Sequence, residues 1–272
     1  MGIISPIPNE DGMVYYGGSG RNVQRVFGVC PADFLQMHTD LVGRGLKVRA
    51  PHAGAQIDFV FYCHALVGAG ADVETLIREY NAAQKGDGAE LMHALSLAKL
   101  YYHYNAAGYC VRIQRTHKSV STADLAIDDI ECELKVRHDQ TWRRMEKHRE
   151  LLYAGRDDEY YDILWGEIRS REQDLASALK NRAAEGFDQA ACVILDLSDH
   201  FDSWNYHRLK YLQQEGHIRG LSTRPVPPVA DACVLFSPYN AVNLNRVGFN
   251  PKAYWGYLPT DGRLIQGSSG DG

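Results

Sequence analysis

The most informative part of this chain is residues 123–136, which read ADLAIDDIECELKV. From residue 130 to 136, apolar residues occupy the even positions and charged residues occupy the odd positions. Successive side chains of a β-strand point to opposite faces, so this alternation predicts a strand with one apolar and one charged face. Residues 123–127 predict a second strand, and Asp128 and Asp129 suit a tight turn between the two. The stretch therefore predicts an antiparallel β-hairpin.

A two-residue turn at Asp128 and Asp129 fixes the register of this hairpin. Apolar residues then face apolar residues along one side, which makes the register self-consistent. The same register sets Asp124 opposite Glu133, where two like charges repel each other. A divalent cation between the two carboxylates would offset that repulsion. Lys135 lies two residues further along the same face.

Two carboxylates and a lysine on one patch suit the hydrolysis of a phosphodiester bond. Mg²⁺, or Mn²⁺ in its place, takes oxygen ligands and is often held by one or two carboxylates together with phosphate and water. Such an ion polarises the phosphoryl oxygen and lowers the pKa of a bound water molecule. A nearby lysine can orient that water or stabilise the developing negative charge.

The elements around the hairpin indicate the fold class. A helix from Asp87 or Gly88 to about Ala106 and a strand at 109–114 precede it. Helices at 140–154 and 158–185 follow it, and a strand at 192–197 reads CVILDL, which suits burial on both faces. A helical crossover from an antiparallel hairpin to a buried strand predicts an α/β fold in which helices flank a mixed β-sheet.

The order of residues and elements resembles a known family. Asp124 followed by Glu133-Leu134-Lys135 resembles the D…ExK signature of the PD-(D/E)xK nuclease superfamily, and the element order over roughly residues 88–200 resembles its restriction-endonuclease-like αβββαβ core. The resemblance implies that Asp124 and Glu133 are metal ligands and that Lys135 is the catalytic lysine. It also implies an auxiliary role for Glu90, on the preceding helix. Ala123 stands where the motif is named for a proline.

Charge is unevenly distributed along the chain. The formal net charge of -5 excludes a uniformly basic coat for nucleic acid. Between residues 150 and 199, however, twelve acidic residues face only five basic ones, so the acidity is concentrated in the crossover. Basic residues instead flank the hairpin, where they can track a phosphate backbone or form a solvated face. The candidates for contact with nucleic acid are Arg115, Lys118, Arg137, Arg143, Arg144 and Lys147.

These observations predict a nuclease that requires Mg²⁺ or Mn²⁺, with DNA favoured over RNA. One alternative is a binding module for nucleic acid or protein that keeps this fold without turnover. Another is an unrelated α/β interaction protein, in which the charged face of the hairpin is simply solvated. Glu131 shares the charged face, where it is either an auxiliary ligand or a solvated residue near the turn.

The chain divides into three parts by composition and pattern. Residues 1–85 predict an N-terminal arm and helical extension, 86–215 the nuclease-like core, and 216–272 a loop-rich C-terminal extension packed on that core. The first part contains helical patterns at 31–42 and 72–83, whereas residues 57–67 suit a buried strand and a buried helix equally well. The two extensions are expected to shape substrate access or to mediate homodimerisation.

The cysteines and the N-terminus suggest a cellular compartment. No two of the six cysteines lie within four residues of each other, which argues against a zinc ribbon or a CxxC redox site. The chain opens without the pattern of a signal peptide, and its longest apolar run is too short to span a bilayer. We expect a soluble cytoplasmic protein with reduced cysteines and no membrane partner.

Overall fold

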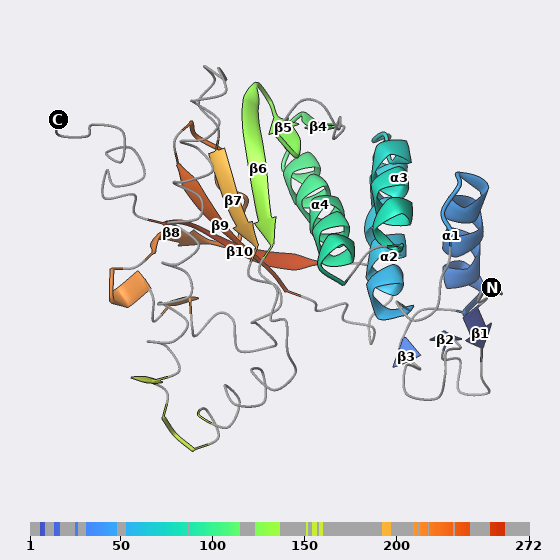
Figure 1. Cartoon of the computed structure of the whole chain (residues 1–272), viewed down its shortest axis with the longest axis horizontal. Coiled ribbons are helices and arrows are strands. Elements are labelled where there is room, and N and C mark those ends of the chain that lie inside the picture. Colours follow the sequence, from blue (N-terminus) through green and yellow to red (C-terminus); the bar gives the residue numbers. More distant parts are fainter. Residues whose placement is uncertain are drawn as a thin grey trace. The chain divides into compact units, whose positions relative to one another are not determined.

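The structure is a computed structural model of the whole chain (Figure 1). It describes residues 6–8, 14–16, 25–26, 31–47, 53–85, 88–114, 123–136, 151, 154–156, 158–159, 192–196, 209–210, 213–216, 218–230, 232–239 and 251–258. The chain forms two compact units. The first comprises Met1–Arg115 with Asn240–Lys252, and the second comprises Thr116–Tyr239 with Ala253–Gly272.

The first unit is mainly helical. Its helices are α1 (Pro31–Gly43), α2 (Ala53–Gly68), α3 (Glu74–Ala83) and α4 (Gly88–Ala106). Its strands are β1 (Pro6–Pro8), β2 (Val14–Tyr16), β3 (Arg25–Val26) and β4 (Val111–Ile113). The first three strands form an antiparallel sheet, α2 packs against α1 and α4, and α3 packs against α4. The predicted helices at 31–42, 72–83 and 88–106 are confirmed.

The ambiguous segment at 57–67 is helical. It lies within α2, where every residue from Phe59 to Cys63 is almost fully buried. The ring of Phe59 stacks on that of Tyr80 from α3, with centroids 3.9 Å apart and an angle of 18° between the planes. A helix that is apolar on all sides shows no amphipathic period, which is why the sequence pattern did not identify it.

The second unit is built on a mixed β-sheet. Its strands are β5 (Leu125–Ile127), β6 (Ile130–Val136), β7 (Cys192–Asp196), β8 (Arg219–Ser222), β9 (Cys233–Tyr239) and β10 (Lys252–Leu258). Within this unit they lie in the order β5-β6-β7-β9-β10-β8. The β5–β6 and β10–β8 pairs are antiparallel, and β6, β7 and β9 run parallel to one another. The predicted α/β class with a mixed sheet is confirmed.

Strand β7 lies in the centre of this sheet, between β6 and β9 (Figure 1). All five of its residues are buried, none of them more than 2% exposed. This confirms the prediction of a strand at 192–197 that is covered on both faces, as parallel strands usually are. The helices predicted at 140–154 and 158–185 lie largely outside the described residues.

The C-terminal part contributes more strand than the sequence predicted. The extension at 216–272, predicted to be rich in loops, contains β8, β9 and β10. The loop assignment at 252–258 was therefore wrong. The alternation of buried residues in β10 breaks at Gly256, where a Cβ atom would lie 2.6 Å from Cγ2 of Ile218, just before β8, and 3.3 Å from the carbonyl oxygen of Arg219 in β8. Across the part of the chain described here, no helix has both the length and the apolar character needed to cross a membrane.

Candidate functional site

The hairpin of β5 and β6 has the register that the sequence predicted. Leu125 pairs with Cys132 and Ile127 pairs with Ile130. Asp128 occupies the first turn position with φ of 52°, a left-handed conformation that aspartate tolerates better than most residues. The apolar side of β6 is closed, since Cys132 and Leu134 are 0% and 1% exposed. The alternation of apolar and charged residues, together with the two-residue turn, was thus sufficient to predict all three pairs between β5 and β6.

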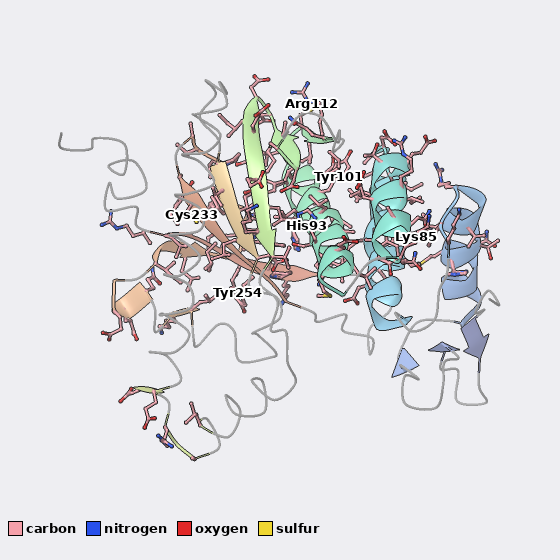
Figure 2. All side chains as sticks on the ribbon, in the orientation of Figure 1. Lys85, His93, Tyr101, Arg112, Cys233 and Tyr254 are labelled. Atoms are coloured by element: carbon pink, nitrogen blue, oxygen red, sulfur yellow. The ribbon has the colours of Figure 1, made fainter. Side chains whose placement is uncertain are left out.

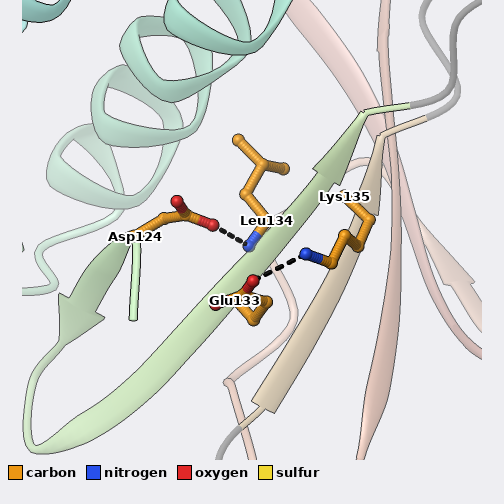
Figure 3. A network of polar contacts seen from close by, with 4 residues as sticks. All are labelled: Asp124, Glu133, Leu134 and Lys135. Carbon is orange, nitrogen blue, oxygen red and sulfur yellow. Dashed lines mark hydrogen bonds and ion pairs between the residues drawn. The ribbon is translucent and has the colours of Figure 1, made fainter. Parts of the chain in front are cut away.

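Asp124 lies just before β5, beyond the last ladder pair at Leu125 and Cys132. Instead of standing as a cross-strand partner of Glu133, its Oδ2 accepts a hydrogen bond of 2.7 Å from the backbone N–H of Leu134 (Figure 3). The carboxylate therefore reaches across to the peptide group that joins Glu133 to Leu134. This bond fixes Asp124 beside the segment that carries the other two predicted site residues.

Glu133 and Lys135 form an ion pair on β6. Lys135 Nζ donates to Glu133 Oε1 at 2.6 Å, and the side chains are 21% and 41% exposed for the glutamate and the lysine (Figure 3). Residues two apart on a strand share a face, which lets the two side chains meet. A pair this exposed contributes at most about 1 kcal/mol to stability, because water screens it.

The face that carries Glu133 and Lys135 becomes apolar on the neighbouring strands. In the parallel register Glu133 pairs with Val193 and Lys135 pairs with Leu195. Val193 and Leu195 are 2% and 0% exposed, so this side of the sheet is covered from β7 onwards. The charged pair therefore lies at the margin of a covered surface, where water has less access than on an open sheet face.

The donor set suits a hard divalent cation. Carboxylate oxygens from two residues, Asp124 and Glu133, are among the ligands that Mg²⁺ takes, with waters and substrate phosphate completing its shell. Within the described residues, no group of three or more histidine, cysteine, aspartate or glutamate side chains is gathered closely enough to hold a metal. A cation here would thus rest on few protein ligands, which is the usual arrangement for Mg²⁺ at phosphate substrates.

The remaining predicted site residues stay predictions. Glu131 is half-buried and pairs across the hairpin with Ala126, which is 4% exposed; this is the middle of the three ladder pairs of β5 and β6. Glu90 is exposed in the first turn of α4, in the first unit. The six basic residues proposed to contact nucleic acid all fall outside the described residues: Arg115, Lys118, Arg137, Arg143, Arg144 and Lys147.

A buried polar cluster in the first unit was missed by the sequence reasoning. Lys99 of α4 is 1% exposed, and its Nζ lies 4.0 Å from Asp58 Oδ2 of α2. One turn further along α4, His103 is 8% exposed and packs against Tyr62 and Tyr102. Burial, and then the charge of Lys99, lower the pKa of His103 to about 4, while burial raises that of Asp58 against the opposing effect of Lys99. Lys99 and His103 lie four residues apart, and so on one face of the helix, among apolar residues of α4. That spacing was the sequence signal that could have identified the cluster.

Two cysteines also meet in the second unit. Cys132 of β6 pairs with Cys192 of β7, and both side chains are fully buried. The Cys132 thiol donates to the backbone oxygen of Ile130 at 3.5 Å, and the Cys192 thiol donates to that of Val193 at 3.7 Å. The interaction between the two neighbouring thiols raises the pKa of Cys132 and lowers that of Cys192. The sequence showed only that both cysteines lie in apolar strands, because the pairing depends on residues far apart in the chain.

Comparison with known proteins found no match for this chain among protein-family models, curated proteins or solved structures.

Proposed function

We propose that this protein hydrolyses phosphodiester bonds of nucleic acid, with DNA the favoured substrate, in a reaction that depends on Mg²⁺ or Mn²⁺. The proposal includes a restriction-endonuclease-like core around the β5–β6 hairpin and the crossover to β7. The observation that carries it is the convergence of Asp124, Glu133 and Lys135 on one short length of β6, through two hydrogen bonds of 2.7 and 2.6 Å.

In this proposal Asp124 and Glu133 hold the cation. The bound ion supplies polarisation of the scissile phosphate and a more acidic water molecule. Lys135 carries a compact positive charge that orients the attacking water and offsets the charge that develops on the phosphoryl oxygens. When substrate and ion are bound, Lys135 exchanges its contact with Glu133 for these partners, an exchange that its partial exposure permits.

The test is an incubation of the purified full chain with labelled linear DNA and RNA, with Mg²⁺, with Mn²⁺ and with a chelator. Three variants remove one function each while keeping side-chain size: Asp124→Asn, Glu133→Gln and Lys135→Met. Each is expected to lower cleavage by at least about 100-fold, in line with the loss of a positioned electrostatic group.

Glu159→Gln is the matched control. Glu159 also pairs with a cation, Arg156, but the pair is exposed and outside the hairpin. Its removal is expected to leave cleavage unchanged. Cleavage that survives in all three hairpin variants would overturn the proposal. Binding of labelled nucleic acid without cleavage, in every metal condition, would instead support the alternative of a non-catalytic binding module.

A further inference from the structure

The two opposed cysteines of the β-sheet form a site that the proposed hydrolysis does not use. Cys132 and Cys192 are direct partners in the parallel pairing of β6 and β7. Each has 0% of its surface exposed. Because partners in a ladder project to the same side, the two side chains enter the same apolar layer on one face of the sheet.

The spacing of the two strands suits a covalent bond between these residues. Neighbouring strands lie about 4.7–4.9 Å apart, which falls inside the Cα separation of about 4.4–6.8 Å that a disulfide spans. The side chains of ladder partners are parallel rather than convergent, so closing the bond requires a small rearrangement of the strands. Disulfides formed under such constraint are more easily reduced than relaxed structural ones.

We propose that Cys132 and Cys192 are a redox modification site, at which a peroxide converts the two thiols into a reversible disulfide that joins β6 to β7. One sulfur, as its thiolate, attacks a peroxide oxygen; the O–O bond breaks, and a sulfenic acid and one water are formed. The second sulfur then attacks the sulfenic sulfur; the S–S bond forms, the S–OH bond breaks, and a second water leaves. Two electrons pass from the thiols to the peroxide, and the thiol protons leave in the two waters.

The chain contains a matched control for this reaction. Cys233 of β9, labelled in Figure 2, is 1% exposed in the same sheet, but its partner in the ladder is Val193. Cys110, in the first unit, is exposed. Its oxidation serves as the positive control that the peroxide is active. Burial alone therefore predicts equal behaviour for Cys132, Cys192 and Cys233, whereas pairing predicts a disulfide between the first two only.

The experiment treats the folded full chain with hydrogen peroxide, blocks the remaining thiols, and maps disulfides by mass spectrometry of an unreduced digest. The expected product is one cross-linked peptide pair containing Cys132 and Cys192, lost on treatment with dithiothreitol and absent from the Cys192→Ala variant. The bond closes a loop of about 60 residues, which restricts the unfolded chain, so the oxidised protein is expected to melt above the reduced one, by less than an unstrained disulfide of that span would give.

The inference is overturned if Cys132 and Cys192 remain reduced at a peroxide concentration that oxidises Cys110. It is also overturned if they pair with Cys233 as often as with each other, since that result indicates oxidation of an unfolded chain. Neither measurement uses catalytic activity, so the inference stands or falls separately from the proposed hydrolysis.

Discussion

The carboxylate of Asp124 accepts a hydrogen bond of 2.7 Å from the backbone N–H of Leu134 and so ties the start of β5 to the middle of β6. Asp124 therefore has a structural role in addition to the metal-binding role proposed for it. The two roles require different properties of the side chain. The hydrogen bond needs an acceptor oxygen, whereas binding of a cation needs a negative charge.

Two substitutions of Asp124 are expected to separate these roles. Asp124→Ala leaves the Leu134 N–H without its acceptor in a partly buried place, which costs about 1–3 kcal/mol of unfolding free energy. Asp124→Asn keeps an acceptor oxygen and should cost less than about 1 kcal/mol. Urea denaturation measures both values. Equal destabilisation by the two variants would show that the charge, rather than the hydrogen bond, holds the hairpin.

Lys135 is expected to matter for activity far more than for stability. Its ion pair with Glu133 is too exposed to contribute more than about 1 kcal/mol, so Lys135→Met should unfold at nearly the same urea concentration as the natural protein. If the proposed hydrolysis is correct, the same variant loses at least about 100-fold in cleavage rate. Denaturation and single-turnover cleavage, measured on one preparation, test this contrast. A large loss of stability would mean that Lys135 has a structural role.

The hairpin could be predicted because all its determinants are local. Alternation with a period of two fixed the faces of β6, and a turn of two aspartates fixed the register, including the pairing of Leu125 with Cys132. Helix α4 was likewise predicted from its own apolar stripe. The strand β7 was predicted from the sequence CVILDL at 192–197, in which every residue but Asp196 is apolar.

Other features depend on partners that are distant in the sequence. Lys99 is buried because α2 brings Asp58 to it, and no local pattern on α4 shows that partner. The opposition of Cys132 to Cys192 depends on the parallel register of β6 and β7. Strand β10 was missed because its alternation of buried and partly exposed residues breaks at Gly256. The glycine is needed there because the chain at the start of β8 lies close to it, a contact that the local sequence does not show.

The pair of buried Lys99 and half-buried Asp58 predicts a non-additive response to mutation. Asp58→Asn removes the carboxylate charge that lies 4.0 Å from the buried Lys99 ammonium and is expected to cost about 2–3 kcal/mol. Replacing both residues, by Asp58→Leu and Lys99→Met, removes the buried charges together and should return the protein to within about 1 kcal/mol of its natural stability. Chemical denaturation of the single and double variants gives the coupling energy. Additive losses would show that the two charges act independently.

A side chain at Gly256 is expected to destabilise the fold. A Cβ atom there would lie 2.6 Å from Ile218 Cγ2 and 3.3 Å from the carbonyl oxygen of Arg219, so β8 must shift in the Gly256→Ala variant. We expect a loss of about 1–3 kcal/mol, as for other overpacked positions. Gly68→Ala is the control, because an added Cβ at the end of α2 meets no atom within 4 Å. Equal stability of the two variants would contradict the close approach of β8 to β10.

His103 is expected to make stability depend on pH in the mildly acidic range. Burial, and then the charge of Lys99, lower the pKa of His103 from 6.5 to about 4 in the folded protein. Between these two pH values the unfolded chain binds the proton and the folded chain does not, so acidification favours unfolding. The contribution of His103 is therefore full above pH 6.5 and decreases by about 3 kcal/mol as the pH falls to 4.

Asp58 acts in the opposite direction, since its raised pKa lets the folded protein keep a proton that the unfolded chain releases. The effect of His103 must therefore be measured as a difference between two proteins. His103→Phe keeps an aromatic ring against Tyr62 and Tyr102 but cannot be protonated. Urea denaturation at pH 7 and pH 5 should show a smaller loss of stability on acidification for this variant than for the natural protein. An equal loss in both proteins would mean that His103 is already protonated in the fold, or that it is exposed to solvent there.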